Sequence, residues 1–270
     1  MRNWIGAAAA ATALFTLALV PYPGRAQAPA KSTKAAGGHP DLGGIWQYMG
    51  SANWDLQDHA ATAGPLWQLG AIAAAPAGQS VLEGGGDIPY LPAAAAKKKQ
   101  NFANRRTLDP EAKCYLPGIP RANYMPYPFQ IVQSPRGILF VYEYATANRM
   151  VNMGKPQEAG SDTWMGTNYG HWEGDTLVVD VTGLNGLAWF DRAGDFASSK
   201  LHVVERFTRS SPYHITYQAT IEDPSVFSKP WKISLPLYKR MEKNAQILEF
   251  KCVEFAEELL YGEFKKQPAK

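Results

Sequence analysis

Motifs for metal, redox and nucleotide chemistry are missing from this sequence. Its two cysteines form no Cys-x-x-Cys motif, and its five histidines are scattered, without the close spacing of a metal site. The triple glycine at residues 84–86 lacks the following Lys-Ser/Thr of a phosphate-binding loop, and there is no Gly-x-Ser-x-Gly motif. The sequence therefore predicts no metal and no cofactor, and it argues against a serine hydrolase of the α/β class.

A large charge of one sign is also missing. Lys and Arg number 27 against 24 Asp and Glu, so the formal net charge is only +3. The longest basic run, Lys97-Lys98-Lys99, follows four alanines and is more typical of the exposed end of a short helix than of a nucleic-acid patch. We therefore expect no nucleic-acid partner.

One long apolar run is present, at residues 4–20. It is short and Ala-rich for a transmembrane helix, and its position after Arg2 and before a proline-containing stretch is typical of a secretory signal peptide. We expect cleavage after Ala26, because cleavage after Ala28 would put Pro29 directly behind the cut. The prediction is a periplasmic or secreted bacterial protein with no stable membrane insertion, and an uncleaved membrane anchor is the alternative.

Export makes the two cysteines a candidate disulfide. In an oxidising compartment, an even number of cysteines favours pairing, here between Cys114 and Cys252. On the chain-entropy account, closing so long a loop stabilises a fold by roughly 4–5 kcal/mol. The alternative is two buried free thiols.

The length of 270 residues suits one domain with one sizeable core. After the signal peptide at residues 1–26, the Ala-, Lys-, Gly- and Pro-rich residues 27–40 are typical of a flexible linker. We expect an irregular covering segment at residues 41–135, a β core at residues 136–262 and a tail at residues 263–270.

Alternation of apolar and polar residues dominates the predicted β core. The two central runs, residues 164–172 and 176–182, meet at Glu173-Gly174-Asp175, a Gly-containing connection that reverses a strand. Further strands are expected at residues 138–144, 149–153, 201–208, 213–222, 231–238 and 246–253. Such short, closely spaced strands predict an antiparallel lipocalin-like β-barrel, with a β-sandwich as the alternative.

The covering segment has three features. Gly44-Ile45-Trp46 is similar to the first strand of lipocalin-like barrels, although a plain core tryptophan is equally consistent with it. Residues 93–103 predict a short helix. Residues 109–129, here called the proline strap, are expected to be extended and rigid, and either to shape a pocket over the barrel mouth or to cover a sheet edge. Their prolines are Pro110, Pro117, Pro120, Pro126 and Pro128, with Pro135 just beyond.

Four sequence blocks carry a family resemblance. They are residues 89–104, residues 109–121, Trp172-Glu173-Gly174-Asp175-Thr176-Leu177-Val178-Val179 and Val203-Val204-Glu205-Arg206. With them the chain resembles, from about Asp87 to Gly262, a large family of uncharacterised exported bacterial proteins. The resemblance implies an exported, β-rich protein and no particular reaction or ligand.

The chain departs from that family at two points. His171 stands where the family usually has Arg, and Ala197-Ser198-Ser199 stands where it often has His-Ser-Asp/Glu. A chemistry that uses that His and acid is therefore not expected here.

Glu205 and Glu143 are the candidate catalytic carboxylates. Each alternates with apolar residues along its strand, and a carboxyl group buried in apolar surroundings suits acid–base catalysis. Arg149 or Arg121 would orient an anionic or carbonyl group of the substrate. The alternative is that each Glu forms a structural ion pair with an Arg, or lies at a barrel rim. His171 is a third catalytic candidate.

Aromatic residues supply the candidate binding surface. Aromatic-lined barrel mouths bind apolar or aromatic small molecules, or stack on sugar rings. Core filling is the ordinary alternative for any single ring. The candidate ligand-binding residues are Trp164, Tyr169, Trp172, Trp189 and Tyr127, together with Arg121 and Arg149.

Three functions are open at this point. The leading hypothesis is an exported β-barrel that binds a small apolar or aromatic molecule beneath the proline strap. The second is an acid–base enzyme of the hydratase, isomerase or lyase type that uses Glu205 and Glu143. The third is a structural or interaction protein of the envelope. The pattern predicts no particular oligomeric state.

Overall fold

The computed structural model describes residues 34–35, 37–64 and 74–262. The expected signal peptide, most of the expected linker and the expected tail lie outside these residues. The chain divides into two compact units, Met1–Ala30 and Lys31–Lys270, and every described residue belongs to the second. Within the described part, no helix is both long and apolar enough to cross a membrane.

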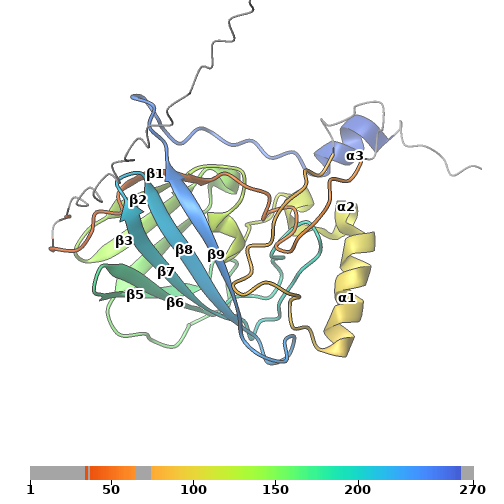
Figure 1. Ribbon diagram of the computed structural model, residues 1–270, viewed down its shortest axis with the longest axis horizontal. Coiled ribbons are helices and arrows are strands. Elements are labelled where there is room, and N and C mark those ends of the chain that lie inside the picture. The colour runs from red at the N-terminus through yellow and green to blue at the C-terminus, as the bar shows by residue number, and fades with distance from the viewer. Residues whose placement is uncertain (1–33, 36, 65–73, 263–270) are drawn as a thin grey trace, which may run out of the picture. The chain divides into compact units, whose positions relative to one another are not determined.

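Nine strands close into a β-barrel, which confirms the predicted fold class (Figure 1). Each strand pairs with the next along the chain, and β1 closes the ring by pairing with β9. The strands are β1 Gly44–Tyr48, β2 Phe129–Gln133, β3 Gly137–Tyr142, β4 Asn148–Met153, β5 Thr167–Glu173, β6 Thr176–Thr182, β7 His202–Ser211, β8 His214–Glu222 and β9 Trp231–Lys239.

The barrel is mostly antiparallel, and its one parallel pair is β4 with β5. Residues 154–166 connect these two strands. A parallel pair needs a connection of about a dozen residues to return the chain to the same end of the sheet, and this one is long enough.

The predicted strand at residues 246–253 is wrong. These residues form no strand, and the ring is completed instead by β1 and by β2, which lies at the end of the proline strap. Because β1 already pairs with β9, the closed ring leaves no edge for a further strand. The apolar residues of the run have no sheet to pack on, and Leu248 is 59% exposed.

The central hairpin confirms the predicted alternation. β5 and β6 pair along their whole length, and Gly174 in the turn has a φ of +59°, a conformation that glycine adopts without strain. Leu177, Val179 and Val181 are completely buried. Glu205 of β7 is paired with Val179 and is buried with it, so its side chain also points into the barrel.

Aromatic side chains fill the barrel interior. Trp46, Phe129, Phe140 and Phe207 are completely buried. The ring centroid of Phe140 lies 5.3 Å from that of Phe207 and 6.1 Å from that of Phe129. The interior is therefore packed as a hydrophobic core.

The proline strap packs into the barrel instead of lying extended across its mouth. It contains two short 3-10 helices, η2 Pro110–Lys113 and η3 Arg121–Asn123. Pro110 begins η2, a position where the missing N–H costs no hydrogen bond. Residues 117–125 are all buried, and Asn123 reaches Glu205 inside the barrel.

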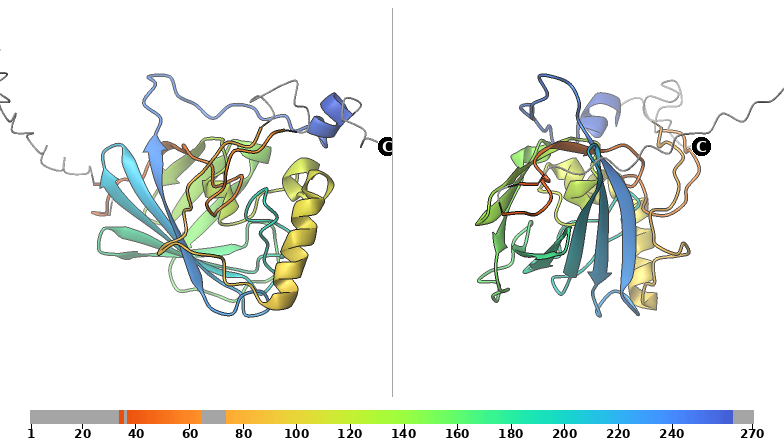
Figure 2. Two further views of the ribbon diagram at one scale, coloured as in Figure 1. Left: turned by 45° about the vertical axis from the view of Figure 1, so that its right-hand side comes forward. Right: turned by 60° about the vertical axis from the view of Figure 1, so that its left-hand side comes forward.

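The helices lie beside the strands (Figure 2). α1 Pro92–Ala103 confirms the helix predicted at residues 93–103, and α2 Arg105–Leu108 follows it directly. Asn101 of α1 donates a hydrogen bond to the carbonyl of Gly194 at 3.1 Å and so fixes the helix to a loop outside the strands. η4 Tyr144–Thr146 follows β3, and α3 Ala256–Tyr261 lies near the end of the described chain.

Residues 240–262, here called the C-terminal segment, leave β9 and run to α3 (blue in Figure 1). The predicted disulfide between Cys114 and Cys252 is confirmed, with a Cα–Cα distance of 5.7 Å. The Phe255 N–H also donates to the carbonyl of Ala112 at 2.7 Å. These bonds tie the C-terminal segment to the proline strap.

Replacing both Cys114 and Cys252 by Ser should lower the free energy of unfolding. The bridge joins residues 138 positions apart, and on the chain-entropy account its loss costs about 4–5 kcal/mol, because the unfolded chain regains freedom. Urea denaturation of the oxidised protein and the double variant measures the difference. A loss below about 1 kcal/mol would contradict the chain-entropy account.

Candidate functional site

Glu205 is the centre of a hydrogen-bond network inside the barrel. Its carboxylate accepts hydrogen bonds from Asn123 at 2.6 Å, from Tyr217 at 2.7 Å and from Arg149 at 2.5 and 3.2 Å. Tyr142 donates to Oδ1 of Asn123 at 2.8 Å. We call these five residues the central network.

The central network is shielded from solvent. The side chains of Arg149 and Glu205 are 1% and 0% exposed. Burial, and then the Glu205 carboxylate, raise the pKa of Tyr217 well above its ordinary value, so the phenol remains a hydrogen-bond donor. Arg149 also donates to Asn168 at 2.9 Å. This is the geometry of a buried ion pair whose carboxylate is fully hydrogen-bonded.

The other two catalytic candidates lie away from Glu205. Glu143 follows the last residue of β3 and accepts a hydrogen bond from the Leu248 N–H at 3.0 Å. Glu143 is half-buried and lies outside the strand, with helical backbone angles (φ −64°, ψ −46°). His171 is exposed on β5, 3.2 Å from Glu173.

Arg121 belongs to a second buried ion cluster. It donates to both oxygens of Asp109, at 2.9 and 3.1 Å, and to Glu111 at 2.6 Å. Arg192 donates two more hydrogen bonds to Glu111, at 2.7 and 2.8 Å. Burial alone would raise the pKa of Glu111, but Arg192 and Arg121 outweigh it and lower the pKa to about 2. All four side chains are thereby paired.

The aromatic candidates are dispersed over the molecule. Trp172 stacks on His39 with ring centroids 4.6 Å apart, and Trp164 packs against Tyr115. Trp164 and Trp189 line a cavity of about 10 Å³, which has room for roughly one water molecule. Tyr169 is half-buried on β5. Of the predicted ligand-binding residues, Tyr127 alone is among the described residues that line a second, much larger pocket, which is described next.

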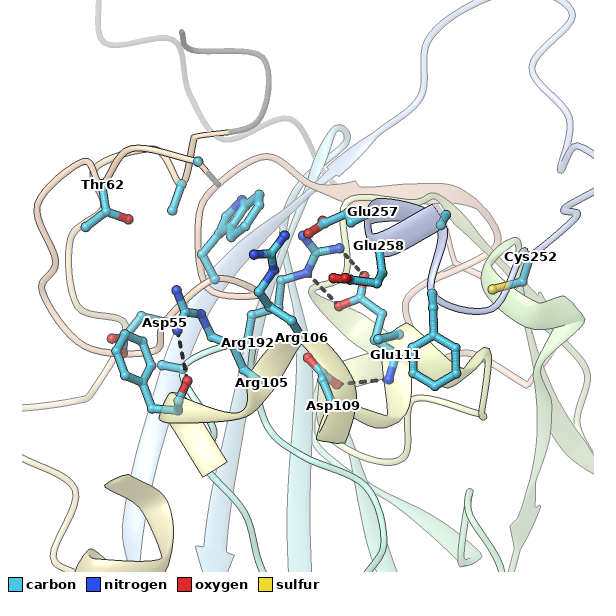
Figure 3. Close-up of a pocket in the computed structure, with 18 of the residues that line it drawn as sticks. Asp55, Thr62, Arg105, Arg106, Asp109, Glu111, Arg192, Cys252, Glu257 and Glu258 are labelled. Atoms are coloured by element: carbon cyan, nitrogen blue, oxygen red, sulfur yellow. Dashed lines mark hydrogen bonds and ion pairs between the residues drawn. The ribbon is translucent and has the colours of Figure 1, made fainter. Parts of the chain in front are cut away.

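That pocket has a volume of about 590 Å³, and none of the described residues that line it belongs to a strand (Figure 3). We call it the side pocket. Its walls come from parts of the chain that are far apart in the sequence. They include residues 54–64, the end of α1 with α2, residues 109–112 of the proline strap and residues 250–258 of the C-terminal segment.

Aromatic rings form much of the side-pocket wall. The ring of Phe250 lies 5.0 Å from the rings of both Tyr127 and Tyr144. Trp54 and Phe102 add two more rings from other parts of the chain. This surface offers an organic ligand both apolar contact and ring stacking.

Charged groups share the wall with these rings. Arg192 is paired with Glu111 at 2.7 Å and lies 3.5 Å from Glu257. The adjacent Arg105 and Arg106 form no ion pair with any carboxylate in the described part of the chain. Burial, and then the neighbouring Arg106 charge, lower the pKa of Arg105.

A carboxylate cluster adjoins the side pocket. One oxygen from each of Asp55, Asp191 and Asp195 lies within 4.8 Å of the others, and Asp55 lines the pocket. Lys98 lies 3.6 Å from Asp195, and Tyr90 donates to Asp195 at 2.9 Å. Burial, and then the charge of Asp195, raise the pKa of Asp191 well above its ordinary value. Burial and Asp195 therefore disfavour the charged form of Asp191, and the charge of Lys98 lies beside Asp195.

Sequence reasoning missed most of the side pocket. Residues 54–64 belong to a run without periodicity, and Phe250 falls in the strand that the structure does not contain. One signal was present: Arg105 and Arg106 are adjacent and directly follow the predicted helix. Adjacent side chains on a helix point in different directions, so only the fold shows that both arginines reach one pocket.

Comparison with known proteins gives no match to a family model, a curated protein or a solved structure. Function therefore has to follow from the geometry of the site itself.

Replacing Glu205 by Gln should lower the free energy of unfolding by about 3–5 kcal/mol, because the buried Arg149 charge loses its counter-charge. Urea denaturation measures this loss. The matched double variant, which also replaces Arg149 by Met, removes both charges and should regain part of the stability. If Glu205→Gln alone were as stable as the wild type, the ion pair of Glu205 with Arg149 would not stabilise the fold.

Stability should also depend on pH through Asp191. Its folded pKa lies above its unfolded value, so its contribution is fully present below about pH 4 and is lost as pH rises through the folded pKa, at up to about 1.4 kcal/mol per pH unit. Asp195→Asn removes the neighbouring charge and keeps an acceptor for Tyr90. Urea denaturation between about pH 5 and pH 8 should give a smaller decline for the variant. Equal declines would show that Asp195 does not control Asp191.

Proposed function

We propose that this chain is an exported protein that binds a small aromatic or apolar molecule in the side pocket. The observation that carries the proposal is the aromatic wall, in which Trp54, Tyr127, Tyr144 and Phe250 border one space of about 590 Å³. Sites for small molecules typically measure about 300–1,000 Å³ and combine apolar walls with a few polar groups.

The barrel interior is a weaker candidate for the ligand site. Asn123 of the proline strap and the central network occupy it, together with fully buried rings such as Phe140 and Phe207. A ligand there would have to displace hydrogen bonds to a buried carboxylate, which is costly. The side pocket demands no such exchange.

The disulfide supports export. It holds Cys252, a residue of the side-pocket wall, against the proline strap. Such a bridge persists in oxidising compartments and is rare in the cytosol. The apolar run at residues 4–20, which favours a signal peptide, lies outside the described residues.

Calorimetric titration of the oxidised protein with naphthylmethanol, a neutral aromatic probe, tests the proposal. Trp54→Ala and Phe250→Ala should each weaken binding by about tenfold or more, because each removes a ring from a different wall. Tyr213→Ala is the matched control, since this exposed ring lies outside the pocket.

Unchanged affinity in both pocket variants would place the ligand elsewhere. Absence of binding by naphthylmethanol, and by a panel of phenols and lipids, would overturn the proposed function itself.

A further inference from the structure

Three arginines of the ion clusters differ from the two arginines of α2. Arg121 and Arg149 are buried and Arg192 is half-buried, and each is paired: Arg121 with Asp109 at 2.9 Å, Arg149 with Glu205 at 2.5 Å, and Arg192 with Glu111 at 2.7 Å. Arg105 and Arg106 are half-buried, and in the described part of the chain they have no such partner. Both line the side pocket, beside one another in α2 (Figure 3).

The hydrogen bonds of the two guanidinium groups are incomplete. Arg105 donates to the carbonyl of Phe102 at 2.8 Å and lies 4.2 Å above the Phe102 ring. Nη2 of Arg106 is buried and has no acceptor among the described residues. Because Nη2 is shielded from solvent, an anion in the pocket would have to bind the two half-buried arginines through their other guanidinium nitrogens.

Three acidic residues of the pocket are paired with other arginines. Asp109 and Glu111 bind Arg121, and Glu257 lies 3.5 Å from Arg192, although its charge also acts on Arg105. Burial raises the pKa of Asp55, which disfavours its charged form. Positive charge is thus concentrated at α2, beside the aromatic wall.

We infer that the ligand of the side pocket is an aromatic carboxylate, with its ring on the aromatic wall and its carboxylate held by Arg105 and Arg106. A guanidinium group binds a carboxylate in a planar, two-bonded geometry, and Phe102 already orients one of the two groups. This inference rests on the proposed function and names the charge of its ligand.

Three probes with the same ring test the inference: naphthoate, naphthylmethanol and naphthylmethylamine. Calorimetric titration of the oxidised full chain should give an affinity for naphthoate at least about tenfold above that for the alcohol, and the amine should bind more weakly than the alcohol. Added salt should weaken naphthoate binding and leave alcohol binding unchanged.

The double variant Arg105→Gln/Arg106→Gln should lose the preference for naphthoate, so that naphthoate and naphthylmethanol bind it with similar affinity. The conservative variant Arg105→Lys/Arg106→Lys should retain part of the preference, because it keeps the charge and loses the planar geometry. Arg136→Gln is the matched control, since this exposed arginine lies in the turn between β2 and β3, outside the pocket.

The two possible failures are distinguishable. If the alcohol binds but naphthoate binds no more tightly, the inferred carboxylate is wrong. If the glutamine double variant keeps the preference, the inferred role of Arg105 and Arg106 is wrong. In both cases the side pocket remains a binding site. If no naphthyl probe binds, the proposed function is overturned, and the carboxylate with it.

Discussion

The buried pair of Glu205 and Arg149 is the constraint on which the rest of the structure depends. Taking a charged group out of water is costly unless the group is paired and hydrogen-bonded. The strands provide Arg149 and Tyr217, and the remaining donor to Glu205 is Asn123 of the proline strap. Satisfying Glu205 therefore brings the proline strap into the barrel, where it occupies the space in which the sequence pattern favoured a ligand.

One part of the proline strap lies inside the barrel, and another part binds segments of the chain that lie outside the barrel. Glu111 joins Arg121 of the strap to Arg192 of a distant loop, and the disulfide at Cys114 brings in the C-terminal segment. The side pocket is the space between these tethered segments. Its walls are held by an ion cluster and a covalent bond, which is why residues outside the strands can form a defined site.

Sequence patterns predicted the strands and their buried faces, because an alternation of period two is a local property. The burial of Glu205 between Val203 and Phe207 followed from it. The hydrogen bond from Asn123 to Glu205 could not be predicted in this way, since Asn123 lies 82 positions earlier in the chain. The same limit hid the side pocket, whose rings at Trp54 and Phe250 come together only when the whole chain has folded.

The location of unpaired charges also indicates where a ligand would bind. Pairing stabilises buried charges, so the described part of the barrel interior, in which Arg149 and Glu205 are matched, is what stability alone would produce. Arg105 and Arg106 depart from that pattern on a short helix outside the barrel, where a change of side chain disturbs no strand. Segments of this kind can carry a binding site whose requirements conflict with stability, because the scaffold does not depend on them. Arg149 is paired inside the barrel, whereas Arg105 and Arg106 have no carboxylate partner among the described residues and lie beside aromatic rings. This contrast favours the side pocket as the ligand-binding site.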